Sequence, residues 1–455
     1  METLFEIAAR SEDDPVLGRL VEHVGDRSRD APCAEIYVPG RVELLGKHAD
    51  YAGGSSLTFA TSRGFRALAF PDDRVSGLTM TSARGGEVVR IDWADDSESP
   101  PTEAAWGVYP RAVVRRIVRH FGTPGSGVFV AFESDLPQAA GMSSSSALLT
   151  TAALSILCAT DVSSSSRFRS AVTGREQLAE FLGAVEAGTS YLDFDSEEGV
   201  GTRGGAQDHA SILCGEAGHI SLFSYLPVQV LERIACPADV SFVICHSGVD
   251  ARKTAGARDD YNQLSDLAAR VGQAWADASP SAGSESRAER ATLAATIADP
   301  YLDESRVIDV IDRIARDPED RRRLFHRFAQ FHDECTIVLP AAVEALRNSD
   351  WTAFAGAAST SQWMAEDWLE NQVEETAYLV RSARAFDAPA ASAFGAGFGG
   401  AVWALIPTPD ADRFAERWVS NYRREYPEHA DDVTVFVERP SKPAAWPDGA
   451  IDGID

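Results

Sequence analysis

Asp135-Leu-Pro-Gln-Ala-Ala-Gly-Met-Ser-Ser-Ser-Ser-Ala-Leu-Leu-Thr150 joins a loop of small residues to four serines and the start of an apolar run. The run continues to Leu157, so the stretch predicts a loop that opens a buried helix, with Ser143 or Ser144 as its cap. The first N–H groups of a helix lack intrahelical partners and favour an anion such as phosphate. Without a lysine after the serines, the P-loop and Rossmann-type fingerprints both fail. Taken alone, the stretch also fits a serine-capped buried helix beside a flexible loop.

The bulk composition indicates more than one domain and a small-molecule partner. The chain has 455 residues, of which 44% are hydrophobic, which is enough to bury two cores. Its 69 acidic and 42 basic residues give a formal net charge of -27. Nucleic acids and anionic membranes require a basic surface, so this charge argues against both as partners.

The cysteines and the N-terminal residues favour a cytoplasmic protein. Six cysteines occur without a C-x-x-C pair or a metal-binding spacing, which is typical of free thiols in a reducing compartment. Residues 1–10 contain no basic segment leading into an apolar core, and no later run approaches the roughly 18 apolar residues of a membrane span. We expect a cytoplasmic protein without membrane contact, either a monomer or a weak homo-oligomer.

Hydrophobic periodicity predicts both strands and helices along the chain. Strands are expected at 34–38, 57–60, 65–70, 128–133, 219–223, 229–234, 240–245, 401–406 and 433–437. Helices are expected at 106–121, from the serines onward, at 176–187, 254–276 and 413–425, and through most of 306–385. Residues 279–287 are expected to form a mobile loop, and the proline-rich segment 440–455 a flexible tail.

Four glycine-containing motifs follow one another in the chain. They are Gly40-Arg41…Gly46-x-His48-x-Asp50-Tyr51, Gly141-x-Ser-Ser-Ser145, Gly204-Gly-x-x-Asp208 and Gly395-x-Gly-Phe-Gly-Gly400. Any one of them is weak evidence, but their order over most of the chain resembles the GHMP small-molecule kinases and, within them, the galactokinases. In the serine stretch Met142 stands for the family's leucine and Ser146 for its first alanine.

The resemblance implies an α+β, two-domain GHMP kinase fold with mixed and antiparallel sheets and helices. The N-terminal domain would cover residues 1–222 and carry the sugar-binding segment and the serine loop. The C-terminal domain would cover 223–439, followed by the tail at 440–455. The active site is expected in the cleft between the two domains.

The resemblance also implies ATP and Mg²⁺ at the serine loop. The ATP-binding residues would be Ala140, Gly141, Met142, Ser143, Ser144, Ser145 and Ser146. Mg²⁺ would be held by Ser145 and by Glu186, which lies on the helix before the Gly204 motif. More residues separate Glu186 from Asp208 than in galactokinases, so Glu197 or Glu198 competes for this role.

Asp208 would be the catalytic carboxylate by the same resemblance. Arg41 would lie beside it, hold it ionised and offset charge on the transferred phosphoryl group. A cap of a glycine-rich turn is the simpler role for an aspartate in this position.

The substrate-binding residues implied by the resemblance are Arg41, Lys47, His48, Asp50, Gly205, Asp208 and Tyr261. Two of the family's positions differ, because Glu43 stands for an asparagine and Lys47 for a glutamate that accepts a hydrogen bond from the O6 hydroxyl of the sugar. An ammonium group only donates, so Lys47 suggests a sugar with a carboxylate or an altered group at C6. A Lys47–Glu43 ion pair and a solvent-facing lysine are the alternatives.

The function implied is an ATP-dependent kinase that phosphorylates the anomeric C1 hydroxyl of galactose or a closely related sugar. The alternatives are a uronic-acid or pentose 1-kinase, and a regulator of the same fold that binds sugar and ATP without turnover. Mevalonate and homoserine kinases are disfavoured, since they lack the Gly-Arg…Gly-x-His-x-Asp-Tyr segment.

Overall fold

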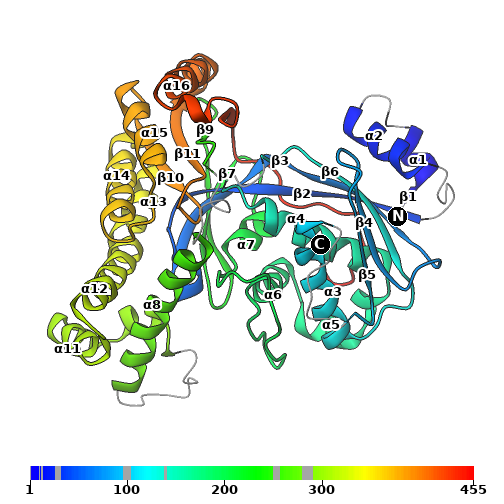
Figure 1. Cartoon of the computed structure of the whole chain (residues 1–455), viewed down its shortest axis with the longest axis horizontal. Coiled ribbons are helices and arrows are strands. Elements are labelled where there is room, and N and C mark those ends of the chain that lie inside the picture. Colours follow the sequence, from blue (N-terminus) through cyan, green and yellow to red (C-terminus); the bar gives the residue numbers. More distant parts are fainter. Residues whose placement is uncertain are drawn as a thin grey trace.

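Two β-sheets with helices packed on them form the protein (Figure 1). The computed structural model describes residues 2–9, 11, 14–25, 32–95, 104–137, 141–249, 257–278 and 290–454. The eight-stranded sheet contains β1 (Glu2–Thr3), β2 (Pro32–Leu45), β3 (Ser55–Pro71), β4 (Gly77–Ser82), β5 (Val88–Asp92), β6 (Val128–Ser134), β7 (His219–Ser224) and β8 (Gln229–Ala235). The four-stranded sheet contains β9 (Val240–His246), β10 (Ala390–Phe394), β11 (Ala401–Pro407) and β12 (Thr434–Glu438).

Strand pairing is antiparallel except between β4 and β6, so the expected mixed and antiparallel sheets are confirmed. The larger sheet runs in the order β1-β2-β3-β6-β4-β5. Strand β3 divides its other edge, pairing with β7 through Ser55–Thr58 and with β6 through Phe65–Pro71. The smaller sheet runs in the order β10-β11-β9-β12.

Most of the helices carry an amphipathic pattern and cover a sheet or each other. Those of the first half are α1 (Leu4–Ala9), α2 (Pro15–Val24), α3 (Val108–Phe121), α4 (Ser144–Ala159), α5 (Ser166–Ala171), α6 (Arg175–Ala187) and α7 (Gln207–Cys214). The later ones are α8 (Ala257–Ala278), α10 (Leu293–Ala298), α11 (Glu304–Ile314), α12 (Pro318–Asp333), α13 (Leu339–Arg347), α14 (Trp351–Asp367), α15 (Glu374–Ala385) and α16 (Ala411–Glu425). None of the helices described is long and apolar enough to cross a bilayer.

Strand β3 presents alternate side chains to two helical layers, as the period of a strand requires. Ala67 and Ala69 belong to the main core, which α4 shares, while Leu68 and Phe70 pack with α1 and α2 on the other face. Helix α4 contacts β2 and β3 on one side and α3, α6 and α7 on the others. It is therefore buried all round, which explains the apolar run that follows the serines.

The end of β2 and the loop after it are shaped by irregular backbone. The pairing of β2 with β3 shifts register between Pro39 and Arg41 and again between Glu43 and Leu45. Such shifts turn side chains toward a site at the edge of a sheet. Gly46 follows at φ +98°, and a Cβ there would lie 2.4 Å from that of Ser56. Only glycine fits this position, so the chain can turn sharply into the loop.

The C-terminal segment corrects one expectation and bears on another. Residues 440–454 are packed rather than flexible: Ala445 forms a bridge with Tyr37, and Ile451 and Ile454 are buried. Apolar side chains among the prolines supply this packing. The proposed division after residue 222 falls inside β7, whose pairing with β8 extends the larger sheet to Ala235.

Helix α4 offers a test of this packing. We expect Leu154→Ala to lower the free energy of unfolding by about 2 to 5 kcal/mol, because Leu154 is fully buried and its loss leaves a cavity. Chemical denaturation measures the change. Leu192→Ala is the control, since Leu192 is 68% exposed and its replacement should have little effect. Equal effects of the two substitutions would contradict a fully packed α4.

Candidate active site

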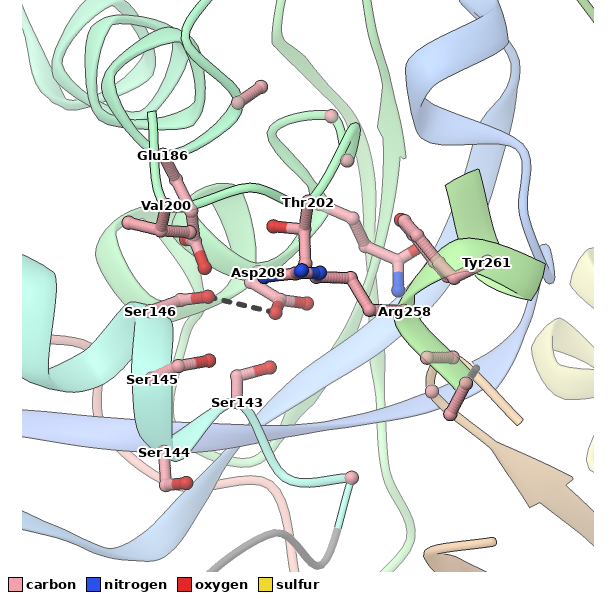
Figure 2. A pocket seen from close by; sticks show the side chains of 18 of the residues that line it. Ser143, Ser144, Ser145, Ser146, Glu186, Val200, Thr202, Asp208, Arg258 and Tyr261 are labelled. Carbon is pink, nitrogen blue, oxygen red and sulfur yellow. Dashed lines mark hydrogen bonds between the residues drawn. The ribbon is translucent and has the colours of Figure 1, made fainter. Parts of the chain in front are cut away.

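A cavity of about 670 Å³ opens where β2, the serine loop, α6, α7, α8 and the last glycine run meet. Most of the residues predicted for the site line this cavity. They are Arg41, His48, Asp50, Gly141, Ser143, Ser144, Ser145, Ser146, Glu186, Gly205, Asp208 and Tyr261. In Figure 2, Asp208 lies between the serines and Glu186 on one side and Arg258 and Tyr261 on the other. Segments far apart in the sequence thus share one site.

Asp208 and Arg41 form an ion pair at the centre of the cavity. Asp208 is in the first turn of α7, and its Oδ1 accepts a hydrogen bond from Arg41 Nε at 2.8 Å. Arg41 is buried on β2 and also donates to the carbonyl of Gly141 in the serine loop. Burial alone would raise the pKa of Asp208, but Arg41 and the hydroxyls of Ser143 and Ser146 lower it below the usual value of 3.8.

The serine loop opens α4 in an unexpected way. Ser143 stands at the N-cap position as predicted, but its backbone angles are left-handed, φ 59° and ψ 36°, and its side chain makes no capping hydrogen bond. The side chain of Ser143 lines the cavity instead. Ser146 Oγ donates to Asp208 Oδ2 at 3.0 Å, which ties the helix start to the carboxylate (Figure 2).

The last glycine run lies against the serine loop. A Cβ on Gly395 would be 3.1 Å from the carbonyl oxygen of Gly141, so there is little room for a side chain between the two loops. Gly141 itself has φ +71°, which favours glycine. Both loops can therefore bring backbone groups close to a ligand in the cavity.

Glu186 lies in the last turn of α6 beside the serines, and its surroundings fit a magnesium ligand. Its Oε2 contacts His209 Nε2 at 2.8 Å, which orients the carboxylate, and its side chain faces the cavity with Ser145. The described residues contain no group of three or more acidic, histidine or cysteine side chains that could enclose a metal. Mg²⁺ needs only one or two carboxylates when phosphate oxygens and waters complete its shell, so this sparse donor set suits it.

The two competing glutamates are engaged elsewhere. Glu197 pairs with Arg119 at 2.5 Å and Glu198 with Arg115 at 2.8 Å, both on the outer part of α3. Neither lines the cavity. The long loop returns to α6 through a hydrogen bond from Val200 N to the carbonyl of Glu186, so the added residues leave Glu186 in the site.

The residues expected to contact a sugar lie together at one end of the cavity. Asp50 Oδ2 accepts hydrogen bonds from the backbone of Gly205 at 3.0 Å and of Gln207 at 3.3 Å. A Cβ on Gly205 would be 2.7 Å from this carboxylate, so glycine is required there. The ring of His48 packs 5.1 Å from that of Tyr261, and burial lowers the pKa of His48 to about 3, which keeps it neutral.

Lys47 is placed differently from our expectation. It is 1% exposed and does not line the cavity; its Nζ donates to Ser392 Oγ at 2.8 Å and Ser361 Oγ at 3.1 Å. Lys47 and Glu43, which are both described residues, form no ion pair, and the lysine does not reach solvent. Burial lowers the pKa of Lys47, while the carboxylates of Glu334 and Glu43 oppose this shift. The ammonium group thus lies among side chains of the C-terminal half, Ser361 and Ser392, and not in the cavity.

One other expected residue, Met142, does not line the cavity. Met142 is buried in the main core and contributes its backbone carbonyl, which accepts from Arg41 N at 3.3 Å. Ala140 lies outside the described residues.

The structure adds cavity residues that the motifs did not assign. They include Glu43, Trp106, Tyr109, Gln207 and Arg258. Trp106 lies in the 3₁₀ turn Ala105–Gly107 that leads into α3, three residues before Tyr109. Arg258 and Tyr261 are three residues apart at the start of α8, so they share a helix face. Spacing alone could have linked Arg258 to Tyr261, but nothing in the sequence linked α3 to the serine loop.

The lowered pKa of Asp208 has a measurable consequence for stability. The contribution of ionised Asp208 to the free energy of unfolding is fully present above about pH 5. It is lost as the pH falls below 3.8 through the folded-state pKa. We expect the stability difference between the native protein and Asp208→Asn to be constant near neutral pH and to shrink in acid. Denaturant titrations across this range measure it; a difference that grows in acid would show that the pKa is raised.

Three protein-family models match this chain. The galactokinase galactose-binding signature matches residues 26–71, the GHMP kinases N terminal domain residues 108–187, and the GHMP kinases C terminal domain residues 342–424. The first contains Arg41, His48 and Asp50, and the second contains the serine loop and Glu186.

Known proteins with similar sequences include galactokinases. The chain is 26% identical to that of Dictyostelium discoideum over 239 residues, covering 51% of this chain and 44% of the relative. It is 23% identical to that of Haemophilus influenzae over 402 residues, covering 87% and 91%. The chain spans about half the length of the first curated relatives it matches, from 44% to 56%.

A solved structure supports the same fold. The crystal structure of Lactococcus lactis galactokinase complexed with galactose superimposes with a TM-score of 0.72 at 20% identity, covering 94% of this chain and 99% of that one. The resemblance expected from the four motifs is confirmed by these matches. The chain has the fold and matches both domain signatures of the GHMP kinases, and among these kinases it resembles galactokinase.

Proposed function

We propose that the protein is an ATP-dependent sugar kinase that phosphorylates the anomeric C1 hydroxyl of galactose or a closely related sugar. One observation carries this proposal: an aspartate kept ionised by a buried arginine faces the N-terminus of a buried helix across a single cavity. The helix start suits phosphate groups, and the carboxylate suits a hydroxyl that must lose its proton. The galactokinase signature over residues 26–71 supports a sugar as the acceptor.

The nucleotide would bind along α4 and α3. Backbone N–H groups at the start of α4 and the hydroxyls of Ser143 and Ser145 can donate to phosphate oxygens. Trp106 and Tyr109 line the same cavity and give a nucleobase aromatic surface to pack against. Ser145 and Glu186 would hold Mg²⁺, which neutralises charge on the phosphates when bound.

The chemical step follows from Asp208 and Arg41. The sugar hydroxyl transfers its proton to Asp208 as its oxygen bonds to the γ-phosphorus, and the bond from that phosphorus to the bridging oxygen breaks to release ADP. Arg41 has two tasks: it keeps Asp208 ionised before the transfer, and its cationic charge offsets negative charge on the phosphoryl group.

Sugar selection would rest on His48, Asp50, Gly205 and Tyr261. Asp50 can hydrogen-bond a sugar hydroxyl, and an isomer that lacks this hydroxyl leaves a buried polar group unsatisfied. Both ring nitrogens of His48 are bonded within the protein, to Tyr51 and to the carbonyl of Ala396, so this ring shapes the site by packing. The alternatives to a galactose kinase are a uronic-acid or pentose kinase and a regulator that binds sugar and ATP without catalysis.

Replacement of the carboxylate tests the catalytic proposal. We expect Asp208→Asn to lower kcat with galactose by about 10²- to 10⁴-fold, because the amide cannot accept the proton, while ATP still binds. A coupled assay of ADP release measures the rate, and calorimetry measures ATP affinity. The control is Asp431→Asn, an exposed aspartate outside the cavity. Sugar and ATP binding without ADP release in the native protein would indicate a regulator instead.

A sugar panel tests the acceptor. Galactose, galacturonate, arabinose and glucuronate are compared by kcat/KM in the same assay. We expect the highest value for galactose, because the described cavity contains Asp50 and Asp208 but not the ammonium of Lys47. A preference for galacturonate would favour the uronic-acid kinase.

A further inference from the structure

Glu43 is a charged residue of the cavity that has no role in the mechanism above. It lies two positions after Arg41 on β2, so both side chains emerge on the same face of the strand. The residue is 2% exposed, and what exposure it has is toward the cavity that it lines.

The two carboxylate oxygens of Glu43 differ in their contacts. Oε2 accepts a hydrogen bond of 2.6 Å from Gln207 Nε2, whereas the buried Oε1 has no hydrogen-bond partner. A buried carboxylate oxygen without a donor is costly, so a bound group that donates to it is strongly favoured. Gln207 directly precedes Asp208 on α7, which fixes Glu43 relative to the reacting carboxylate.

The charges around Glu43 decide which ligand group suits it. Asp50 and Asp208 are further carboxylates of the same cavity, and Arg41 already serves Asp208 and Gly141. Lys47 is withdrawn to Ser361 and Ser392. Burial raises the pKa of Glu43, and Arg41 and Lys47 oppose this shift. A sugar hydroxyl can donate to the free oxygen of Glu43. A sugar carboxylate at the same place would be repelled by the carboxylates of Glu43, Asp50 and Asp208.

We propose that Glu43 is a specificity-determining residue that contacts the sugar: its free Oε1 takes a hydrogen bond from a sugar hydroxyl and disfavours a sugar carboxylate at the same place. This inference rests on the proposed sugar-binding function. The carboxylate that accepts a hydrogen bond from the sugar would then be at position 43 of this chain, because a lysine stands at position 47.

The test is Glu43→Gln. The amide carbonyl can keep the bond from Gln207, which places the NH₂ group where Oε1 was and turns an acceptor into a donor. We expect the affinity for galactose to fall about tenfold, the factor that a hydrogen bond to a charged group contributes. The ratio of galacturonate to galactose kcat/KM should rise by more than this. Dissociation constants from calorimetry give the same comparison without turnover.

Two controls separate recognition from folding. Glu438→Gln replaces another buried glutamate, 2% exposed and bonded to Ser62, and should leave the sugar ratio unchanged. Glu43→Asp keeps the negative charge, but its side chain is one methylene shorter, so the carboxylate lies farther from the sugar. Galactose affinity should therefore fall, while galacturonate stays excluded. This second variant decides the question if Glu43→Gln does not fold.

The outcomes distinguish this inference from the proposed function. A native protein that phosphorylates galactose, with both Glu43 variants keeping its sugar ratio and affinity, overturns the role of Glu43 alone. A native protein that binds no sugar overturns the proposed function itself. Galactose analogues that each lack one hydroxyl identify the contact, because the loss of affinity for one analogue should disappear in Glu43→Gln.

Discussion

The ion pair between Arg41 and Asp208 is the interaction on which the site depends. Arg41 comes from a strand of the larger sheet and Asp208 from the first turn of α7, and each also contacts the serine loop, through Gly141 and Ser146. Buried ion pairs contribute little net stability, because desolvation offsets the attraction. The consequence of this pair is chemical, since it keeps the carboxylate ionised and fixes it beside the N-terminus of α4.

A second set of buried charges connects the loop after β2 to the C-terminal helices. Glu334, fully buried in the π-helical segment Glu334–Val338, accepts from Gly46 N at 2.7 Å and from Ser361 Oγ at 2.9 Å. Lys47 donates to the same Ser361. The lysine therefore lies near a carboxylate behind the site, and the acidic groups Glu43, Asp50 and Asp208 line the cavity.

The order of motifs was enough to predict the fold and to bring Arg41, the serines, Glu186 and Asp208 into one site. It could do so because glycines and charged residues at fixed positions meet close-approach requirements that tolerate little change, as at Gly205. The direction of Lys47 could not be predicted, because Glu334 and Ser361 lie hundreds of residues away in sequence. The same holds for the packed tail, whose partner Tyr37 is near the other end of the chain.

The most direct test of the central claim is the product formed in this cavity. Phosphorus and proton nuclear magnetic resonance of the native protein with ATP, Mg²⁺ and galactose follows the γ-phosphoryl group as it leaves ATP. The account predicts a sugar phosphate whose phosphorus couples to the anomeric proton, formed in equal amount with ADP. A phosphate on another hydroxyl, or ATP that stays intact while both ligands bind, would contradict it.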